Sequence, residues 1–488
     1  MKNLKTIFGM AAFAIMAVAC SNDDDVLNSQ QPEQHAKEQG IPFIATISAS
    51  QADDQTRAVG ESGNTFTSNY VKDEQVYLLY QIGNSKYEAT ATVTEVDGSG
   101  NATIEATLES GIANNTEVTL IYPASAAATN KSGNIKDGIL SEQVGTLSAV
   151  PDIRKGTSTF VVDGGTATLA DGTTLAAQYA ICKFTIQNLN EQPLPITSLK
   201  VTDKSNNVIT TVTPGSATDV LYVTLPASTD YTWFEATGSD GKSYINHATA
   251  SLLAGKAYHP TMKMATVGDG ILGDLGNDGK FVKMPHSSAV AVIAYVGKVE
   301  KYFDRFLAIA LTDVQVGNPN DYGFYVYLLS DAKTYGADYA DGNPIRLDGV
   351  NYNKTKYENN GLTTADYDVV KNSKTTSSAT SGELKKGWRI PSVTDWRYVF
   401  AGIGGLEPTT PTNPVGIGEA EVYTNSTTLR ANINAACCNE NLLTKVYWTI
   451  SDVTSHHNNE WYFDFSNNKT YYNSESSSKC CVRLVFAY

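Results

Sequence analysis

The chain contains few charged residues and no cluster of basic ones. Charged side chains make up 18% of its 488 residues, and the formal net charge is −15. A nucleic-acid-binding protein normally presents a basic face to the phosphates, so this composition argues against that class. A low charged fraction, together with 38 Gly, 27 Tyr and many Thr, Ser and Asn residues, is typical of exported β-rich proteins.

Long apolar runs are also absent beyond the N-terminal region. The one that occurs, residues 7–19, is shorter than the ~20 residues that a membrane-spanning helix needs, and it suits the hydrophobic part of a signal peptide. Lys2 and Lys5 supply the positive charge that precedes such a segment. We therefore expect residues 1–20 to be a signal peptide and no later segment to span a membrane.

Cys20 ends this segment, in Ala17-Val18-Ala19-Cys20, which resembles the cleavage site of bacterial lipoproteins. Cys20 would then carry acyl chains such as palmitate, and at ~0.8 kcal/mol per buried CH₂ several chains anchor a protein firmly. An ordinary secretory signal with a chance cysteine is the alternative. The segment Ser21-Asn22-Asp23-Asp24-Asp25, with its three acidic residues, resembles an export signal to the outer face of the outer membrane, or else forms a solvated spacer. Residues 21–40 predict a flexible tether.

Motifs of enzyme active sites are missing as well. The sequence has no nucleophile elbow, no phosphate-binding loop and no HExxH zinc motif. His456 and His457 form the only His pair, and adjacent histidines seldom face one metal ion, so a loop is the favoured interpretation. We expect no cofactor, no metal and no enzymatic activity.

The six cysteines divide into three kinds. Cys20 is assigned to lipid, and Cys182 lies in an apolar stretch that predicts a strand with a packed thiol. The others form two vicinal pairs, Cys437-Cys438 and Cys480-Cys481. Export favours disulfides, and four cysteines allow three connectivities. Because a bond between adjacent cysteines strains the backbone, we favour a bridge between the pairs over a zinc site, whose usual ligand spacing is missing.

Short strands separated by turn residues dominate residues 41–267. Spacing of about ten residues predicts two β-sandwich domains, at residues 41–150 and 151–267. A hairpin is expected around the turn at residues 97–101. The expected strands are residues 41–47, 75–80, 89–96, 102–108, 117–123, 180–187, 221–226, 231–236 and 257–264.

Residues 268–488 have a different character, which predicts a glycine-rich linker at 268–276 and then an α+β domain. Strands are expected at residues 303–314, 322–329, 446–450, 460–465 and 481–488, and a helix at 363–370. A second helix should follow the capping box formed by Ser392 and Asp395. Its apolar face would contain Trp396, Val399, Phe400 and Ile403, and Gly404-Gly405 would end it.

Several short motifs follow one another in the first half of the chain. They are the lipoprotein signal, Thr56-Arg57-Ala58, the strand at 76–80, Leu120-Ile121-Tyr122-Pro123 and Leu253-Ala254-Gly255-Lys256-Ala257-Tyr258. In this order, residues 41–265 resemble the fimbrillins, the subunits of type V pili. The resemblance implies that an Arg-directed protease cuts between Arg57 and Ala58 and that a strand from the next subunit replaces residues 41–47. Alternatively, Arg57 is a plain loop residue.

Motifs of another kind occur in the second half. They are Gly387-Trp388-Arg389-Ile390-Pro391-Ser392 with Asp395-Trp396, Tyr447-Trp448-Thr449-Ile450-Ser451, Trp461-Tyr462-Phe463-Asp464-Phe465 and Val482-Arg483-Leu484-Val485. They resemble the C-type-lectin-like domains, in particular the major paralogous branch of bacterial surface proteins. The calcium-dependent sugar signature is missing, since Glu407-Pro408-Thr409 is a poor match. The resemblance therefore implies a scaffold and no particular ligand.

Together these features predict a mainly β pilus tip adhesin, whose partners are other pilus subunits and a glycan or protein on a host or bacterial surface. The last strand, at residues 481–488, belongs to the terminal domain in this interpretation and is not free to be donated to another subunit. The subunit would therefore be the last one of the pilus, at its tip. The alternative is a non-polymerising surface lipoprotein that binds glycan or protein and stays anchored at Cys20.

Overall fold

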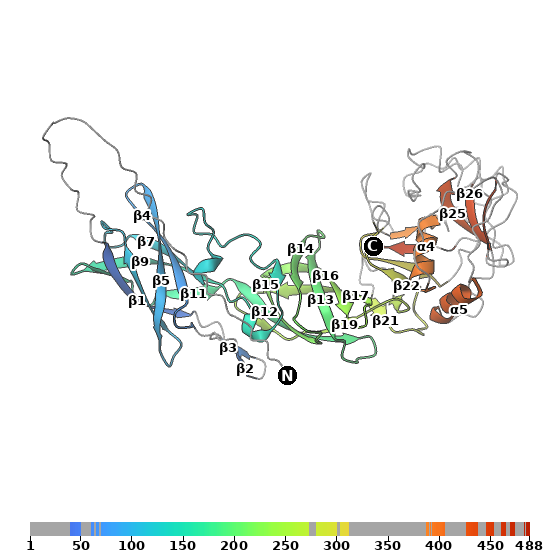
Figure 1. Cartoon of the computed structure of the whole chain (residues 1–488), viewed down its shortest axis with the longest axis horizontal. Helices are drawn as coiled ribbons and strands as arrows, with labels where there is room; N and C mark the ends of the chain where they lie inside the picture. Colours follow the sequence, from blue (N-terminus) through green and yellow to red (C-terminus); the bar gives the residue numbers. More distant parts are fainter. Residues whose placement is uncertain are drawn as a thin grey trace, which may run out of the picture. The chain divides into compact units, whose positions relative to one another are not determined.

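The computed structural model of the chain describes residues 70–272 without a break and the rest of the chain in part. The described residues are 40–49, 60–62, 65–67, 70–272, 280–299, 303–311, 387–389, 391, 393–405, 426–437, 446–452, 460–464, 469–473, 483 and 485–488. This part of the chain is mainly β, as the sequence predicts, with α4 and α5 as its α-helices (Figure 1). No helix within these ranges is long and apolar enough to cross a membrane.

Some predicted features lie outside the described residues and stay predictions. They are Cys20, Arg57, Ala58, the strand at 322–329, the helix at 363–370, Glu407, Cys438, His456, His457, Cys480 and Cys481.

The first sheet closes on itself through its N-terminal strand. Its order is β10-β1-β11-β9-β7-β4-β5-β6, and β1 also pairs with β6 (Figure 1). The strands are β1 (Ile41–Ala49), β4 (Gln75–Ile82), β5 (Ser85–Val96), β6 (Ala102–Leu108), β7 (Glu117–Tyr122), β9 (Arg154–Asp163), β10 (Thr166–Leu169) and β11 (Thr174–Ala177). A separate hairpin consists of β2 (Gly60–Ser62) and β3 (Thr65–Thr67).

Alternate side chains of these strands fill one core. Phe160 lies at its centre and meets Phe43 and Tyr80 edge to face, with ring centroids 5.7 and 5.4 Å apart. The expected hairpin is confirmed, since β5 and β6 are antiparallel neighbours. Its turn is fixed by Asp97, whose carboxylate accepts from the backbone N–H of Asn101 at 2.9 Å.

The first sheet continues past residue 150, where the sequence places a domain boundary. Strand β9 pairs with β7 along the whole of β7, and β10 and β11 then pair with both β9 and β1. The local pattern of residues 154–177 gives no sign of these partners, because they are distant in sequence. The boundary expected at residue 150 is therefore corrected: these strands belong to the first sheet.

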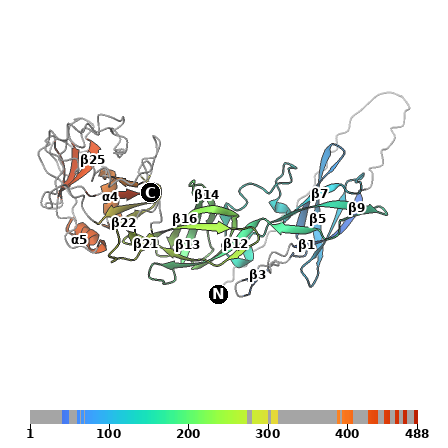
Figure 2. The ribbon, with the colours of Figure 1, turned by 180° about the vertical axis from the view of Figure 1, so that it is seen from behind.

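Two further sheets enclose the second core (Figure 2). One has the order β15-β12-β18, with β19 also beside β12, and the other has the order β17-β16-β13-β14-β8. Their strands are β8 (Glu142–Gln143), β12 (Tyr179–Asn188), β13 (Ile196–Asp203), β14 (Val208–Val212), β15 (Val220–Pro226), β16 (Ser228–Gly238), β17 (Ser243–Leu252), β18 (Ala257–Tyr258) and β19 (Thr261–Met264). Two 3₁₀ turns, η1 (Ala124–Ala126) and η2 (Leu147–Ala149), lie before and after β8 in the chain.

Two expectations for this region can be compared with the structure. Cys182 is a buried free thiol on β12, as expected, and burial raises its pKa to about 12. The strand expected at 257–264 is divided into β18 and β19. Pro260 separates them, because proline has no N–H to donate to a ladder.

The described residues of the C-terminal region form one sheet of six strands, one of three strands and the helices α4 and α5. The strands are β20 (Gly270–Leu272), β21 (Lys280–Val282), β22 (Ala291–Val296), β23 (Phe306–Ala310), β24 (Gly387–Arg389), β25 (Val446–Asp452), β26 (Glu460–Asp464), β27 (Lys469–Asn473) and β28 (Val485–Ala487). The helices are α4 (Val393–Ala401) and α5 (Ser426–Ala436). Part of the expected linker is corrected, since β20 hydrogen-bonds to β22.

The helix expected after the capping box is confirmed as α4. Trp396, Val399 and Phe400 of its predicted apolar face are buried in a core shared with β22 and β23. Ile403, at 7% exposed, is buried in the same core but lies in the turn after α4, because the helix ends at Ala401. The capping-box residue Asp395 is also buried. The chain turns immediately after α4, as the two glycines predict.

Gly402, in that turn, allows α4 to lie directly on β22. A Cβ at this position would stand 1.9 Å from the carbonyl oxygen of Ala294. Gly402→Ala should therefore force the helix away from the strand and lower the free energy of unfolding by about 1–3 kcal/mol. Urea denaturation followed through tryptophan fluorescence, to which the buried Trp396 contributes, measures this change. Gly98→Ala is the control, because a Cβ there meets no atom within 4 Å. Equal midpoints for the two variants would contradict this packing.

Candidate functional site

Strand β1 presents one face to the first core and the other to solvent. Phe43, Ala45 and Ile47 point inward and are 1%, 4% and 0% exposed. Ile44, between them, points outward and is 49% exposed. This alternation is the period-2 pattern of a half-buried strand, and it explains why residues 41–47 could be recognised as a strand from the sequence.

The hydrogen-bonding partners of β1 lie on both of its sides. It is antiparallel to β6 from Ile41, opposite Leu108, to Ile47, opposite Ala102. It is parallel to β10 at Phe43 and to β11 at Ser48 and Ala49. Without β1 the sheet would open, leaving unpaired backbone groups on β6 and β10 and an uncovered core. Burial of a Phe or Ile side chain alone is worth ~1.5–3 kcal/mol, so loss of β1 would cost several kcal/mol of apolar burial.

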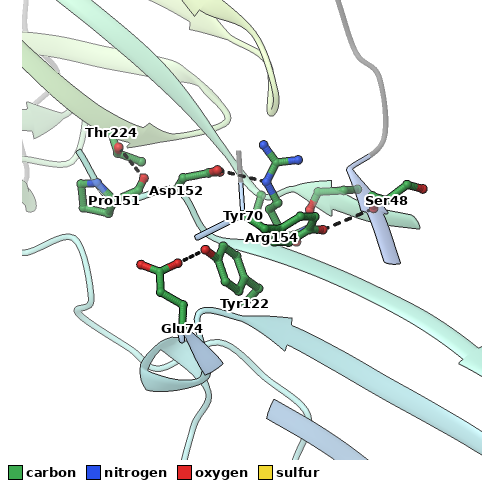
Figure 3. A network of polar contacts seen from close by, with 10 residues as sticks. Ser48, Tyr70, Glu74, Tyr122, Pro151, Asp152, Arg154 and Thr224 are labelled. Atoms are coloured by element: carbon green, nitrogen blue, oxygen red, sulfur yellow. Dashed lines mark hydrogen bonds and ion pairs between the residues drawn. The ribbon is translucent and has the colours of Figure 1, made fainter. Parts of the chain in front are cut away.

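The C-terminal end of β1 is held by Tyr70. The Tyr70 hydroxyl donates to the carbonyl oxygen of Ser48 at 3.3 Å (Figure 3). The Tyr70 ring is buried and stands edge-on to the ring of Tyr122, with centroids 4.8 Å apart. Tyr122 in turn donates a hydrogen bond to Glu74. These contacts fix the chain on each side of the segment that contains Arg57.

A buried ion pair also contacts Tyr70. Arg154 and Asp152 are joined by an Nε–Oδ2 distance of 3.0 Å, and their side chains are 4% and 5% exposed. The Arg154 guanidinium lies 5.9 Å from the centroid of the Tyr70 ring. Burial raises the pKa of Tyr70, and the charge of Arg154 opposes that rise only in part. The Tyr70 hydroxyl therefore stays protonated and able to donate at neutral pH.

The same network reaches the second core. Thr224, on β15, donates from its hydroxyl to the carbonyl oxygen of Pro151 at 2.8 Å (Figure 3). Gln143, a buried residue of β8, donates to the carbonyl oxygen of Thr224 at 2.8 Å and accepts from its N–H at 2.9 Å. Residues that hold the end of β1 are thus connected with residues that fix the chain between the first and second cores.

Tyr70→Phe should lower the free energy of unfolding of the first sheet by about 0.5–1.5 kcal/mol, since it removes one hydrogen bond and keeps the ring. Faster amide hydrogen exchange in β1 would report the change. Tyr87→Phe serves as control, because Tyr87 packs its ring on Tyr80 in the same core, with centroids 6.0 Å apart. If both variants exchange alike, the Ser48 contact does not hold the strand.

The last strand of the chain lies inside a sheet. β28 pairs with β23 on one side and with β24 on the other. The backbone carbonyl of Tyr488 accepts from the N–H groups of Asp304 and Arg305 at 2.9 and 2.6 Å. Residues 485–487 are therefore paired on both sides within the C-terminal sheet.

Arg305, beside this strand, reaches into the second β region, which consists of the two sheets around the second core. Its guanidinium pairs with Glu235 and donates to Thr202 Oγ1 and Asn206 Oδ1, each at 2.8 Å. It also lies 5.3 Å from the centroid of the Trp233 ring. Burial lowers the pKa of Arg305 to about 10.

The Arg305 cluster was not predicted. A single arginine before an apolar strand was the only sequence signal, because the partners of its guanidinium are about 70 to 100 residues away.

Of the predicted site residues, the structure describes Cys437 alone. It is 4% exposed and follows α5. The disulfide between the two cysteine pairs stays a prediction, as do lipidation at Cys20 and cleavage after Arg57. Within the described residues there is no group of three or more His, Cys, Asp or Glu side chains that could hold a metal ion.

Comparison with protein-family models and with curated proteins gave no match. Among solved structures, the chain is similar to a fimbrial protein from Bacteroides ovatus, with 12% identity over 92% of this chain and 99% of that one, at a TM-score of 0.26. It is also similar to a fimbrial assembly protein from Parabacteroides distasonis, with 11% identity over 50% of this chain and 94% of that one, at a TM-score of 0.27. The similarity to fimbrial proteins is thus found at low identity and low TM-score.

Proposed function

We propose that the chain is a cell-surface fimbrial subunit that accepts a strand from another subunit in place of β1. The observation that carries this proposal is the position of β1, which closes the first sheet and is covered on its inner face by the core. A cut after Arg57 would leave β1 attached by non-covalent contacts alone. A strand from another chain could then restore the same backbone hydrogen bonds and apolar contacts by β-augmentation.

The subunit occupies the tip of the fimbria in this proposal. Polymerisation requires each subunit to accept a strand and to donate one. Residues 485–487 are paired with β23 and β24, so this strand could be donated only by breaking the sheet that contains it. A subunit that accepts but does not donate ends the fibre. The C-terminal region, residues 268–488, would then face outward and contact a glycan or protein on another surface.

Lipid on Cys20 serves delivery in this proposal. The lipoprotein signal would bring the chain to the outer membrane and hold it at the cell surface until cleavage. Because Cys20 and β1 both precede Arg57, one cut would release the anchor and open the sheet together. The lipid would then be a temporary attachment.

Cleavage is tested by N-terminal sequencing of the protein shed from the cell surface. The expected start is Ala58, and Arg57→Ala should stay in the membrane fraction with its lipid. Lys72→Ala is the matched control, because Lys72 is the next basic residue along the chain and is exposed. Shed protein without a start at Ala58 would favour the permanently anchored surface lipoprotein.

Placement at the tip is tested by immunogold labelling with antibodies against residues 268–488. We expect label at fibre ends. Label along the whole shaft would contradict this placement and leave the strand-accepting role to be judged by the cleavage experiment.

A further inference from the structure

We infer that the site occupied by β1 selects its strand by side-chain size, and that the donated strand carries a large, a small and a large apolar residue at alternate positions. This inference rests on the proposed function, because it names the kind of strand that such a subunit would accept. The occupant is a segment of another protein chain with the pattern aromatic, any, small, any, branched aliphatic.

The pattern comes from the residue pairs between β1 and β6. Phe43 lies opposite Ala106, and on its other side it lies beside Ala167 of β10. Two alanines therefore flank the one aromatic residue of β1. The space they leave is completed by Phe160, whose ring meets Phe43 edge to face. A short side chain at this position would leave a cavity in the core.

Two residues further along, the sizes are reversed. Ala45 lies opposite Ile104, which is 0% exposed. Directly opposite residues on one face of an antiparallel pair have Cβ atoms ~4.5–5.5 Å apart, and both side chains point into the filled first core. A large residue at the Ala45 position would therefore overpack the core beside Ile104. The next inward pair is large and small again, because Ile47 lies opposite Ala102.

The size alternation is confined to the inner face. Ile44 points outward and is 49% exposed, so its replacement by a polar residue should not change the fit. At the start of the ladder Ile41 lies opposite Leu108, and both are large. The selective stretch therefore covers the three inward positions from Phe43 to Ile47.

The test uses the full chain without its signal peptide, cut at Arg57 by an Arg-specific protease. Synthetic peptides with the sequence of residues 41–49 compete with a fluorescent copy for the site. We expect Phe43→Ala to weaken binding at least about 100-fold and Ala45→Phe to weaken it about 10- to 100-fold. Ile44→Thr should stay within about threefold of the unmodified peptide.

A size exchange makes the test specific. In a chain that carries Ile104→Ala, the Ala45→Phe peptide should bind better than the unmodified one, since the large residue then has the small one opposite it. The same two substitutions together in the uncut chain should restore the urea midpoint lost by Ala45→Phe, which checks that the variant folds.

Equal binding of all peptides would overturn the inference, and so would failure of every peptide to enter the cut chain. Both results come from protein that is cut in vitro, so neither depends on whether the chain is cleaved at Arg57 in cells. Absence of cleavage at Arg57 in cells would instead refute the proposed function, while the size selection measured with peptides would stand.

Discussion

Phe43→Ala should lower the free energy of unfolding of the first sheet by about 3–5 kcal/mol, the range for truncating a buried aromatic residue. Phe43 is 1% exposed, and the alanines beside it, Ala106 and Ala167, are too short to fill the space it would leave. The loss should appear mainly as easier opening of β1 from β6. After cleavage at Arg57, β1 with Ala at position 43 should therefore dissociate faster than the native β1.

The measurement has to report on the first sheet. All five tryptophans, from Trp233 onward, lie after this sheet in the sequence, so tryptophan fluorescence does not follow it. Amide hydrogen exchange of residues 102–108, which pair with β1, is the suitable readout. Ile44→Ala is the matched control, because Ile44 is on the same strand and points to solvent. A similar loss in both variants would mean that β1 is not seated in the core as described.

Features that depend on local pattern were predictable from the sequence. β1 and the β5–β6 hairpin show alternation and a turn signal within a few residues. For α4, a capping box, an apolar face and two glycines agree on one helix. Each of these elements is specified by neighbours in the sequence, and the structure has all of them at or near the expected residues.

Features that depend on distant partners were not predictable. The boundary expected at residue 150 was wrong because β9 and β10 find their partners in β7 and β1. Tyr70 gave no signal, because its contacts to Ser48 and Arg154 are made only after the sheet has closed. The size alternation between β1 and β6 was equally hidden, since it is a property of the register and not of either strand alone.

If the proposed function holds, the position of Arg305 has a mechanical consequence. Force on residues 268–488 would reach the rest of the chain through the contacts between the C-terminal sheet and the second β region. Those contacts form an aromatic cluster in which Trp233 lies 4.3 Å from Tyr488 and 6.0 Å from Phe306, between ring centroids. The Arg305 side chain, 4% exposed, joins the two sides of this cluster through its charge and two hydrogen bonds.

Arg305→Ala should lower the free energy of unfolding by about 3–5 kcal/mol, because breaking a buried, hydrogen-bonded ion pair removes the partners of several polar groups at once. Tryptophan fluorescence during urea denaturation is the readout, because Trp233, one of the five tryptophans, lies under the guanidinium. Lys263→Ala is the matched control: its ion pair with Glu191, at 2.6 Å, is solvent-exposed on both sides and should matter little. If the two variants unfold at the same urea concentration, Arg305 does not hold the C-terminal sheet to the second β region. If only Arg305→Ala shifts, the joint that would transmit an adhesive load depends on this one buried arginine.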